Sequence, residues 1–124
     1  MKKVAVILFN LGGPTSLKAV RPFLFNLFHD PAIISLPQPF RFMLASFISF
    51  FRTAKAKKIY AEIGGKSPIL EETQRQVDAL QAALNAEFSG KRNEYRVWMS
   101  MRYWRPFAKD VALEVRAYEP DSVV

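Results

Sequence analysis

The sequence contains no cysteine and only one histidine, His29. Without cysteine, this stretch forms no disulfide bond and holds no thiolate-bound metal or iron–sulfur cluster. A single histidine does not build a multi-histidine metal site by itself. We therefore expect no metal site made by these residues.

The sequence also lacks an apolar run that could span a bilayer, which takes about 20 residues. Its apolar stretch from Phe42 to Phe51 has ten, and it predicts either a helix packed in the core or an exposed lip that touches a membrane or a hydrophobic ligand. Lys2 and Lys3 precede the short apolar run Val4–Phe9, but Gly12–Pro14 follows instead of a signal-peptide cleavage site. We expect a cytoplasmic protein.

Acidic residues are scarce in the first half of the chain. Residues 1–60 carry nine basic side chains against Asp30 alone, a formal charge of +8, whereas residues 61–124 carry nine basic and ten acidic side chains. Eight of the eleven phenylalanines also lie between Phe23 and Phe51. Basic charge beside aromatic surface suits an anionic membrane, a nucleic acid or a flat aromatic ligand with carboxylates.

Three segments are predicted to form strands. The continuous apolar run Val4–Phe9 is typical of a buried strand in a parallel sheet that helices cover on both faces. Further strands are predicted at Tyr95–Met101 and from Ser122 onward. Because ligands bind beyond the carboxyl ends of such strands, a site is expected near Asn10–Pro14.

Helices are predicted between these strands. Gly64 and Gly65 should end one of them, and Ser67 and Pro68 should open the next as N-cap and first helical residue. This alternation predicts an α/β fold with a parallel sheet flanked by helices. The helices are expected over residues 17–28, residues 53–63, from Pro68 to Phe88 and from Pro106 to Tyr118, with a polar loop at Ser89–Asn93.

Two glycine-containing segments do not make nucleotide-binding motifs. Gly65-Lys66-Ser67 resembles the end of a phosphate-binding loop, but Tyr60 stands where the first glycine is required. Gly12-Gly13 lacks the third glycine of a dinucleotide-binding fingerprint. Neither segment therefore predicts a nucleotide.

Six segments of the sequence form a distinctive series. They are, in order, LFNLGGP (Leu8–Pro14), PFLFNLF-D (Pro22–Asp30), ISLP (Ile34–Pro37), RT (Arg52-Thr53), IY--IGGKSP (Ile59–Pro68) and MRY--P (Met101–Pro106). Taken together, they resemble the amino-terminal part of the ferrochelatase family. The resemblance implies a two-domain chelatase fold, of which residues 1–124 would form part of the first Rossmann-like domain and end inside a third strand, with the second domain absent.

The resemblance also implies the site. Arg52, Tyr60 and Ser67 match positions that contact the porphyrin, chiefly at its propionates, and Leu11 matches a position that faces the macrocycle. Arg102 and Tyr103 would lie beside the pocket floor. An apolar lip would contain Phe23, Leu24, Leu27 and Phe28.

The catalytic groups are expected elsewhere. In this family a histidine and acidic residues remove the pyrrole protons, and they would lie beyond the position that matches Val124. His29 is not their counterpart, because a histidine at a helix C-terminus has a simple electrostatic explanation. The 124-residue chain alone is expected to be inactive.

The resemblance implies insertion of ferrous iron into protoporphyrin IX to form protoheme, the last step of heme biosynthesis. Iron is then a substrate, and no cofactor is required in this segment. Peripheral contact with the inner face of the membrane is also expected. Coproporphyrin III as substrate and a non-catalytic membrane-surface module stay open as alternatives, whereas nucleic-acid binding is disfavoured because most aromatic residues fall in helix-like apolar stripes.

Overall fold

The computed structural model describes residues 1–88 and 92–124, so positions 89–91 of the predicted polar loop lie outside the described residues. The chain falls into two compact units: unit 1 contains residues 1–11 and 69–124, and unit 2 contains residues 12–68. Its elements are β1 (Lys2–Asn10), η1 (Leu17–Ala19), α1 (Val20–His29), α2 (Phe40–Glu62), α3 (Ile69–Phe88), β2 (Asn93–Met101), α4 (Ala108–Tyr118) and β3 (Ser122–Val123).

Unit 1 is built on a parallel sheet with the strand order β2-β1-β3. β1 is the central strand and pairs with β2 along its whole length, from Lys2 opposite Asn93 to Asn10 opposite Met101. Its apolar sequence fits this place, because a strand covered on both faces has few polar side chains. The predicted parallel α/β architecture and its three strands are confirmed.

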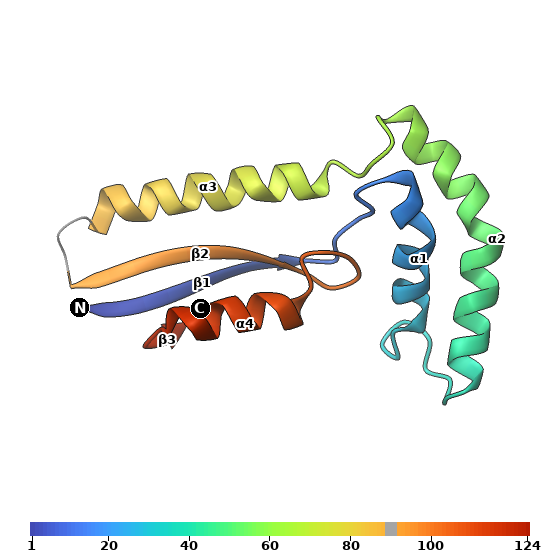
Figure 1. Cartoon of the computed structure of the whole chain (residues 1–124), viewed down its shortest axis with the longest axis horizontal. Coiled ribbons are helices and arrows are strands. Elements are labelled where there is room, and N and C mark those ends of the chain that lie inside the picture. The colour runs from blue at the N-terminus through green and yellow to red at the C-terminus, as the bar shows by residue number, and fades with distance from the viewer. Residues whose placement is uncertain (89–91) are drawn as a thin grey trace. The chain divides into compact units, whose positions relative to one another are not determined.

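Helices α3 and α4 cover opposite faces of this sheet (Figure 1). On the α4 face, Trp98 of β2 packs with Ala5 of β1 and with Val111 and Val115 of α4. Tyr118 of α4 packs against this cluster. The core of unit 1 thus draws on strands and helices that are far apart in the sequence.

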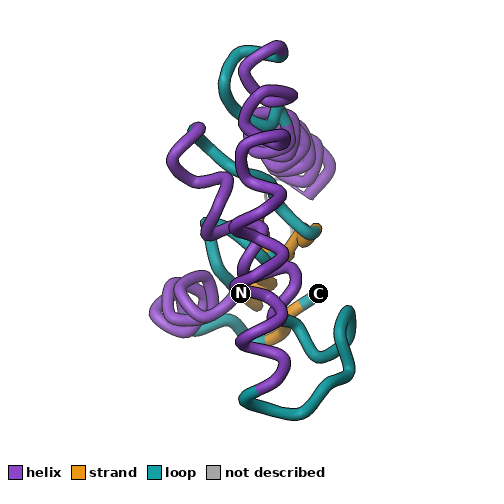
Figure 2. Tube along the Cα trace, turned by 90° about the vertical axis from the view of Figure 1, so that its right-hand side faces the viewer, coloured by secondary structure: helices purple, strands orange, loops and turns teal. Residues whose placement is uncertain are grey.

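Unit 2 is a pair of helices, α1 and α2, that pack side by side and are joined by a loop (Figures 1 and 2). Val20 and Phe23 of α1 are buried, and so are Ala45 and Ser49 of α2. The two α2 residues are four positions apart and therefore lie on the same face of the helix. Small side chains at this seam let the two helices approach closely.

Helix α2 differs from its prediction in extent and in burial. It is one helix of 23 residues that joins the apolar stretch Phe42–Phe51 to the basic segment predicted as a separate helix. The core interpretation of Phe42–Phe51 is wrong, since Phe47 is 61% exposed and Phe51 is 63% exposed. The buried positions of this stretch are Ala45 and Ser49. None of the helices in the described residues is long and apolar enough to cross a membrane.

Two predicted helix starts are also corrected. α3 begins at Ile69, so Pro68 precedes the helix instead of opening it. α4 begins at Ala108, two residues after Pro106, whose carbonyl accepts a hydrogen bond of 2.7 Å from the backbone N–H of Met101. Gly64 and Gly65, with φ of 102° and 83°, follow the end of α2 as predicted.

Candidate functional site

The carboxyl ends of β1 and β2 bring three predicted site residues together in unit 1. The backbone N–H of Arg102 donates to the carbonyl of Asn10 at 3.0 Å, and that of Tyr103 donates to the carbonyl of Leu11 at 3.0 Å. The Tyr103 side chain is buried, Leu11 is exposed, and the Arg102 guanidinium lies 5.6 Å from the centre of the Tyr103 ring. The two strand ends thus bring Leu11, Arg102 and Tyr103 together, and the contact of these residues with a porphyrin stays a prediction.

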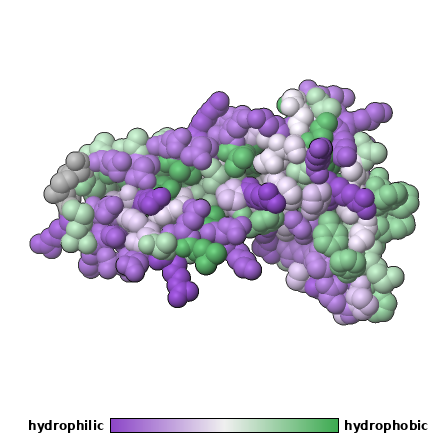
Figure 3. Space-filling view, viewed as in Figure 1, coloured by the Kyte–Doolittle hydropathy of each residue, from purple (hydrophilic) through white to green (hydrophobic). Residues whose placement is uncertain are grey.

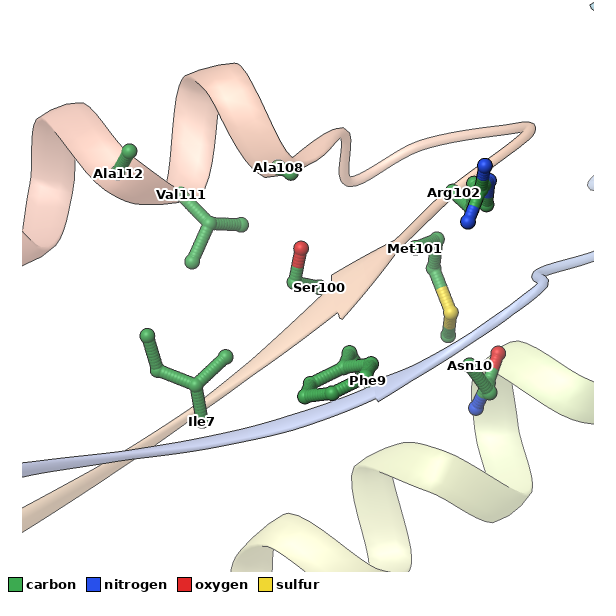
Figure 4. A pocket seen from close by; sticks show the side chains of 9 residues that line it. All are labelled: Ile7, Phe9, Asn10, Ser100, Met101, Arg102, Ala108, Val111 and Ala112. Carbon is green, nitrogen blue, oxygen red and sulfur yellow. The ribbon is translucent and has the colours of Figure 1, made fainter. Parts of the chain in front are cut away.

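A pocket of about 430 Å³ opens at this end of the sheet, on its α4 face. Figure 4 shows Ile7, Phe9, Ser100 and Val111 pointing into the same space between the strands and α4. Most of its lining is apolar, with polar groups from Asn10, Ser100 and Arg102. Such a pocket can take a flat apolar group whose polar edge meets a guanidinium.

Phe9 and Ser100 were not predicted as site residues. Phe9 is 82% exposed although it belongs to the central strand, because it lies near the end of β1. The signal was present in the strand period of two, which places Ile7 and Phe9 on one face of β1. Reading β1 as an unbroken apolar run hid that alternation.

Asn10 is held by a hydrogen-bond chain. Its Nδ2 donates to Thr73 Oγ1 at 3.0 Å, and Thr73 Oγ1 donates to the carbonyl of Ile69 at 2.6 Å. Thr73 is buried on α3. These bonds fix the carboxyl end of β1 to the first turn of α3.

Arg52 lies on α2 in unit 2, where its side chain is exposed. Its guanidinium is 5.6 Å from the centre of the Phe28 ring, a residue of α1. A cation above an aromatic face is attracted by the ring quadrupole while its N–H groups stay available. Arg52 can therefore present a bidentate fork to a carboxylate next to an apolar ring.

Tyr60 and Ser67 flank the glycine turn that follows α2. The carbonyl of Tyr60 accepts a hydrogen bond of 2.7 Å from the N–H of Gly65. The N–H of Ser67 donates to the carbonyl of Pro14 at 2.8 Å, which ties the end of unit 2 to its beginning. Both side chains are half-buried, and the capping role predicted for Ser67 stays a prediction.

The predicted lip residues lie on α1 with different exposure. Phe23 is buried in unit 2, whereas Leu24, Leu27 and Phe28 are half-buried. Phe23 is thus part of the core of this unit, and the exposed phenylalanines are on α2. His29 is the last residue of α1, as expected, and its ring stacks on Phe25 with centroids 5.1 Å apart.

No group of three or more His, Asp or Glu side chains that could hold a metal ion is found among residues 1–88 and 92–124. The polar groups of the candidate site are instead guanidinium, hydroxyl and amide groups. These groups bind carboxylates and orient ligands. The six predicted contact residues are divided equally between the units, with Leu11, Arg102 and Tyr103 in unit 1 and Arg52, Tyr60 and Ser67 in unit 2.

A parallel sheet with a pocket beyond its carboxyl ends defines an α/β ligand-binding protein. Comparison with known families narrows this class, because the family model named Ferrochelatase matches residues 3–124. The chain belongs to the ferrochelatase family.

Curated relatives agree with this assignment. The chain is 60% identical over 124 residues to a ferrochelatase of Wolbachia sp. subsp. Drosophila simulans (strain wRi), covering 100% of this chain and 38% of the relative. It is 52% identical over 122 residues to a ferrochelatase of Phenylobacterium zucineum, covering 98% of this chain and 35% of that relative. It is 46% identical over 123 residues to a ferrochelatase of Rickettsia conorii, covering 99% and 35% respectively. The chain thus spans less than two fifths of the length of these relatives.

Proposed function

We propose that this chain supplies porphyrin-binding residues to a ferrochelatase, a lyase that inserts ferrous iron into protoporphyrin IX to give protoheme in the last step of heme biosynthesis. The family match over residues 3–124 is the observation that carries the proposal. In this reaction ferrous iron replaces two pyrrole hydrogens, which leave as protons. The residues of this chain bind and orient the macrocycle.

Arg52 has the main binding role. Its exposed guanidinium pairs with a porphyrin propionate, and the Phe28 ring beside it contacts the apolar disc. The Tyr60 and Ser67 hydroxyls donate further hydrogen bonds to the carboxylates. In unit 1, Leu11 offers an apolar surface to the macrocycle. Arg102, which lines the pocket, and the neighbouring Tyr103 contact the porphyrin beside it. No cofactor takes part in these contacts.

The proposal is tested by titrating the chain with protoporphyrin IX and following the Soret band and the fluorescence. The double variant Arg52→Ala, Ser67→Ala is expected to bind at least about tenfold more weakly, because a hydrogen bond to a charged group contributes about 1.5–3 kcal/mol.

The matched control is Lys58→Ala, Ser46→Ala, which removes the same two kinds of group from α2. The Ser46 hydroxyl donates to the carbonyl of Phe42 in its own helix at 2.8 Å. Equal weakening by both double variants, or no weakening by the first, would contradict the assigned contacts.

The same titration with coproporphyrin III decides between the two substrates. Protoporphyrin IX is favoured because the half-buried leucines of α1 and the exposed phenylalanines of α2 offer apolar surface. Coproporphyrin III carries more carboxylates and gains less from such surface. Tighter binding of coproporphyrin III would reverse this choice.

We further propose that α2 rests on the cytoplasmic side of a membrane through an aromatic stripe. The stripe consists of exposed side chains of α2, and Figure 3 shows hydrophobic surface over this helix. Arg21 lies 5.4 Å from the ring of Phe50 and adds positive charge at its border. The members of the aromatic stripe are Phe40, Met43, Phe47, Phe50 and Phe51.

Sedimentation with lipid vesicles tests the membrane proposal. The double variant Phe47→Ala, Phe51→Ala is expected to bind vesicles at least about tenfold more weakly, because burying one such ring contributes about 1.5–3 kcal/mol. Leu113→Ala removes an equally exposed apolar side chain from α4 and serves as the control. Unchanged binding by the double variant would refute the role of the aromatic stripe.

A further inference from the structure

The outer edge of β2 has no neighbouring strand in the part of the chain that the structure describes. The even-numbered residues of β2 bond to β1, as the flanking bonds from Lys2 N–H to Arg92 carbonyl and from Arg102 N–H to Asn10 carbonyl indicate. Backbone N–H and C=O groups alternate in direction along a parallel ladder. The N–H and C=O groups of the odd-numbered residues of β2 therefore point away from β1, toward the open edge. Such an edge is a template for pairing with another chain.

Gln81 of α3 occupies two of these outward positions. Its Nε2 donates to the carbonyl of Tyr95 at 2.8 Å, and its Oε1 accepts from the N–H of Val97 at 2.9 Å. A neighbouring strand would supply the same pair, a donor for the Tyr95 carbonyl and an acceptor for the Val97 N–H. The Gln81 side chain therefore takes the place of a strand.

The orientation of the Gln81 amide is fixed from a third side. Its Nε2 also donates to Asn85 Oδ1 at 3.0 Å on the same helix. A flipped amide would point its oxygen at two acceptors and its NH₂ group at the N–H of Val97. The two bonds to β2 are therefore specific to one orientation.

The other end of the edge is covered by the chain itself. The N–H of Met101 donates to the carbonyl of Pro106 at 2.7 Å, and Met101 forms a bridge with Phe107. Between the two covered ends lies a groove of about 330 Å³, bordered by Met99. Asp110 and Glu114 also line this groove.

We propose that Gln81 keeps β2 from pairing with a second copy of this chain. The segment Tyr95–Met101 reads YRVWMSM, with a single charge and several strand-forming residues, so an opened edge is self-complementary. Loss of the Gln81 amide frees the Tyr95 carbonyl and the Val97 N–H at once. The second copy then supplies the missing partners.

The test compares Gln81→Leu with Gln76→Leu. Both changes place leucine on α3, but Gln76 is exposed, whereas Gln81 is half-buried and bonds to β2. Sedimentation velocity should give the mass of a dimer or larger species for Gln81→Leu as its concentration rises, and should leave Gln76→Leu like the parent chain. At low concentration, exchange of the Val97 amide hydrogen should be at least about tenfold faster in Gln81→Leu.

Gln81→Glu and Gln81→Asn complete the set. In Gln81→Glu the carboxylate retains an acceptor for the Val97 N–H and adds a charge at the edge, so this variant should sediment with the mass of the parent chain. In Gln81→Asn the side chain is too short to reach β2, so this variant should associate. Gln81→Asn keeps the test valid if Gln81→Leu does not fold. Equal masses for folded Gln81→Asn, Gln81→Leu and Gln76→Leu at every concentration would overturn the proposal. Equal association of Gln81→Glu and Gln81→Leu would overturn it too, because charge would then offer no protection.

Discussion

At the scale of single residues, Tyr118 has a side chain whose chemistry is changed by its surroundings. Its ring lies 5.3 Å from that of Trp98, with Lys3 Nζ 5.1 Å from its centre. Burial, and next the negative charge of Glu94, raise the pKa of Tyr118 above its ordinary value of 10.0. The folded chain therefore retains this proton to higher pH than the unfolded chain does.

This difference predicts how stability depends on pH. Below pH 10 the contribution of Tyr118 is fully present, and it is lost as the pH rises through the raised pKa, because the unfolded chain releases its proton first. Tyr118→Phe should reduce the fall in the free energy of unfolding above pH 10, measured by urea denaturation at several pH values. Tyr95→Phe is the control, and an equal effect of both changes would contradict the prediction.

Residue patterns predicted local backbone better than side-chain exposure. Gly64 and Gly65 were expected to end a helix, and both have the positive φ that glycine adopts without strain. Phe9 was expected to be buried with its strand, yet it is the exposed wall of a pocket. The exposure of a strand residue depends on how far the covering helix extends over the strand. The local sequence does not show this extent, because it depends on tertiary packing.

At the scale of elements, the seam between α1 and α2 decides which face of α2 is buried. Ala45 is fully buried there, so Ala45→Leu should force the helices apart and lower the free energy of unfolding by about 1–3 kcal/mol. Ala54→Leu places the same side chain at an exposed position of α2 and should change stability by less than about 0.5 kcal/mol. Chemical denaturation of both variants checks this, and the prediction is wrong if they are equally stable.

The sequence predicted that Phe42–Phe51 is helical or lip-forming, but not which face it buries. Large apolar side chains occur all around this stretch, because Leu44 and Ile48 lie on the side that the phenylalanines leave, so hydrophobic periodicity gives no clear direction. The small residues Ala45 and Ser49 select the seam because only they permit close approach of α1. A search for small residues four positions apart would have found it.

At the scale of the whole molecule, positive charge is concentrated in unit 2. Residues 12–68 carry eight basic and two acidic side chains, a formal charge of +6 out of +7 for the chain. Each basic side chain near an anionic bilayer contributes about 1 kcal/mol to the free energy of binding. Two such side chains together therefore change the affinity by more than about tenfold. Binding to phosphatidylserine vesicles should therefore weaken at least about tenfold when salt rises from 0.1 M to 1 M, as the Debye length shrinks from about 10 Å to 3 Å.

Charge variants give the control for this salt prediction. Lys57→Gln with Lys58→Gln should weaken vesicle binding, whereas Lys109→Gln with Arg116→Gln, on exposed positions of α4, should not. Phosphatidylcholine vesicles should show little salt dependence. Equal effects of the two double variants would show that only net charge matters, and not its place in unit 2.

The fold class, the three parallel strands and the family could be predicted from sequence, because apolar strand runs and the six motifs are local patterns. The strand order β2-β1-β3 was not predicted and came from the structure. For the candidate site, the sequence could predict the residues but not their arrangement in space. Arg52 and Arg102 belong to two different compact units. The pocket beside Phe9 needed the packing of α4 against the sheet, which joins residues about a hundred positions apart.

The small-residue seam of unit 2 has a practical consequence for protein engineering. Because large apolar side chains of α2 lie outside the packed interface, solubility and folding stability depend on different positions of one helix. Polar substitutions in the aromatic stripe can then raise solubility without loosening the helix pair. The two properties can be optimised independently.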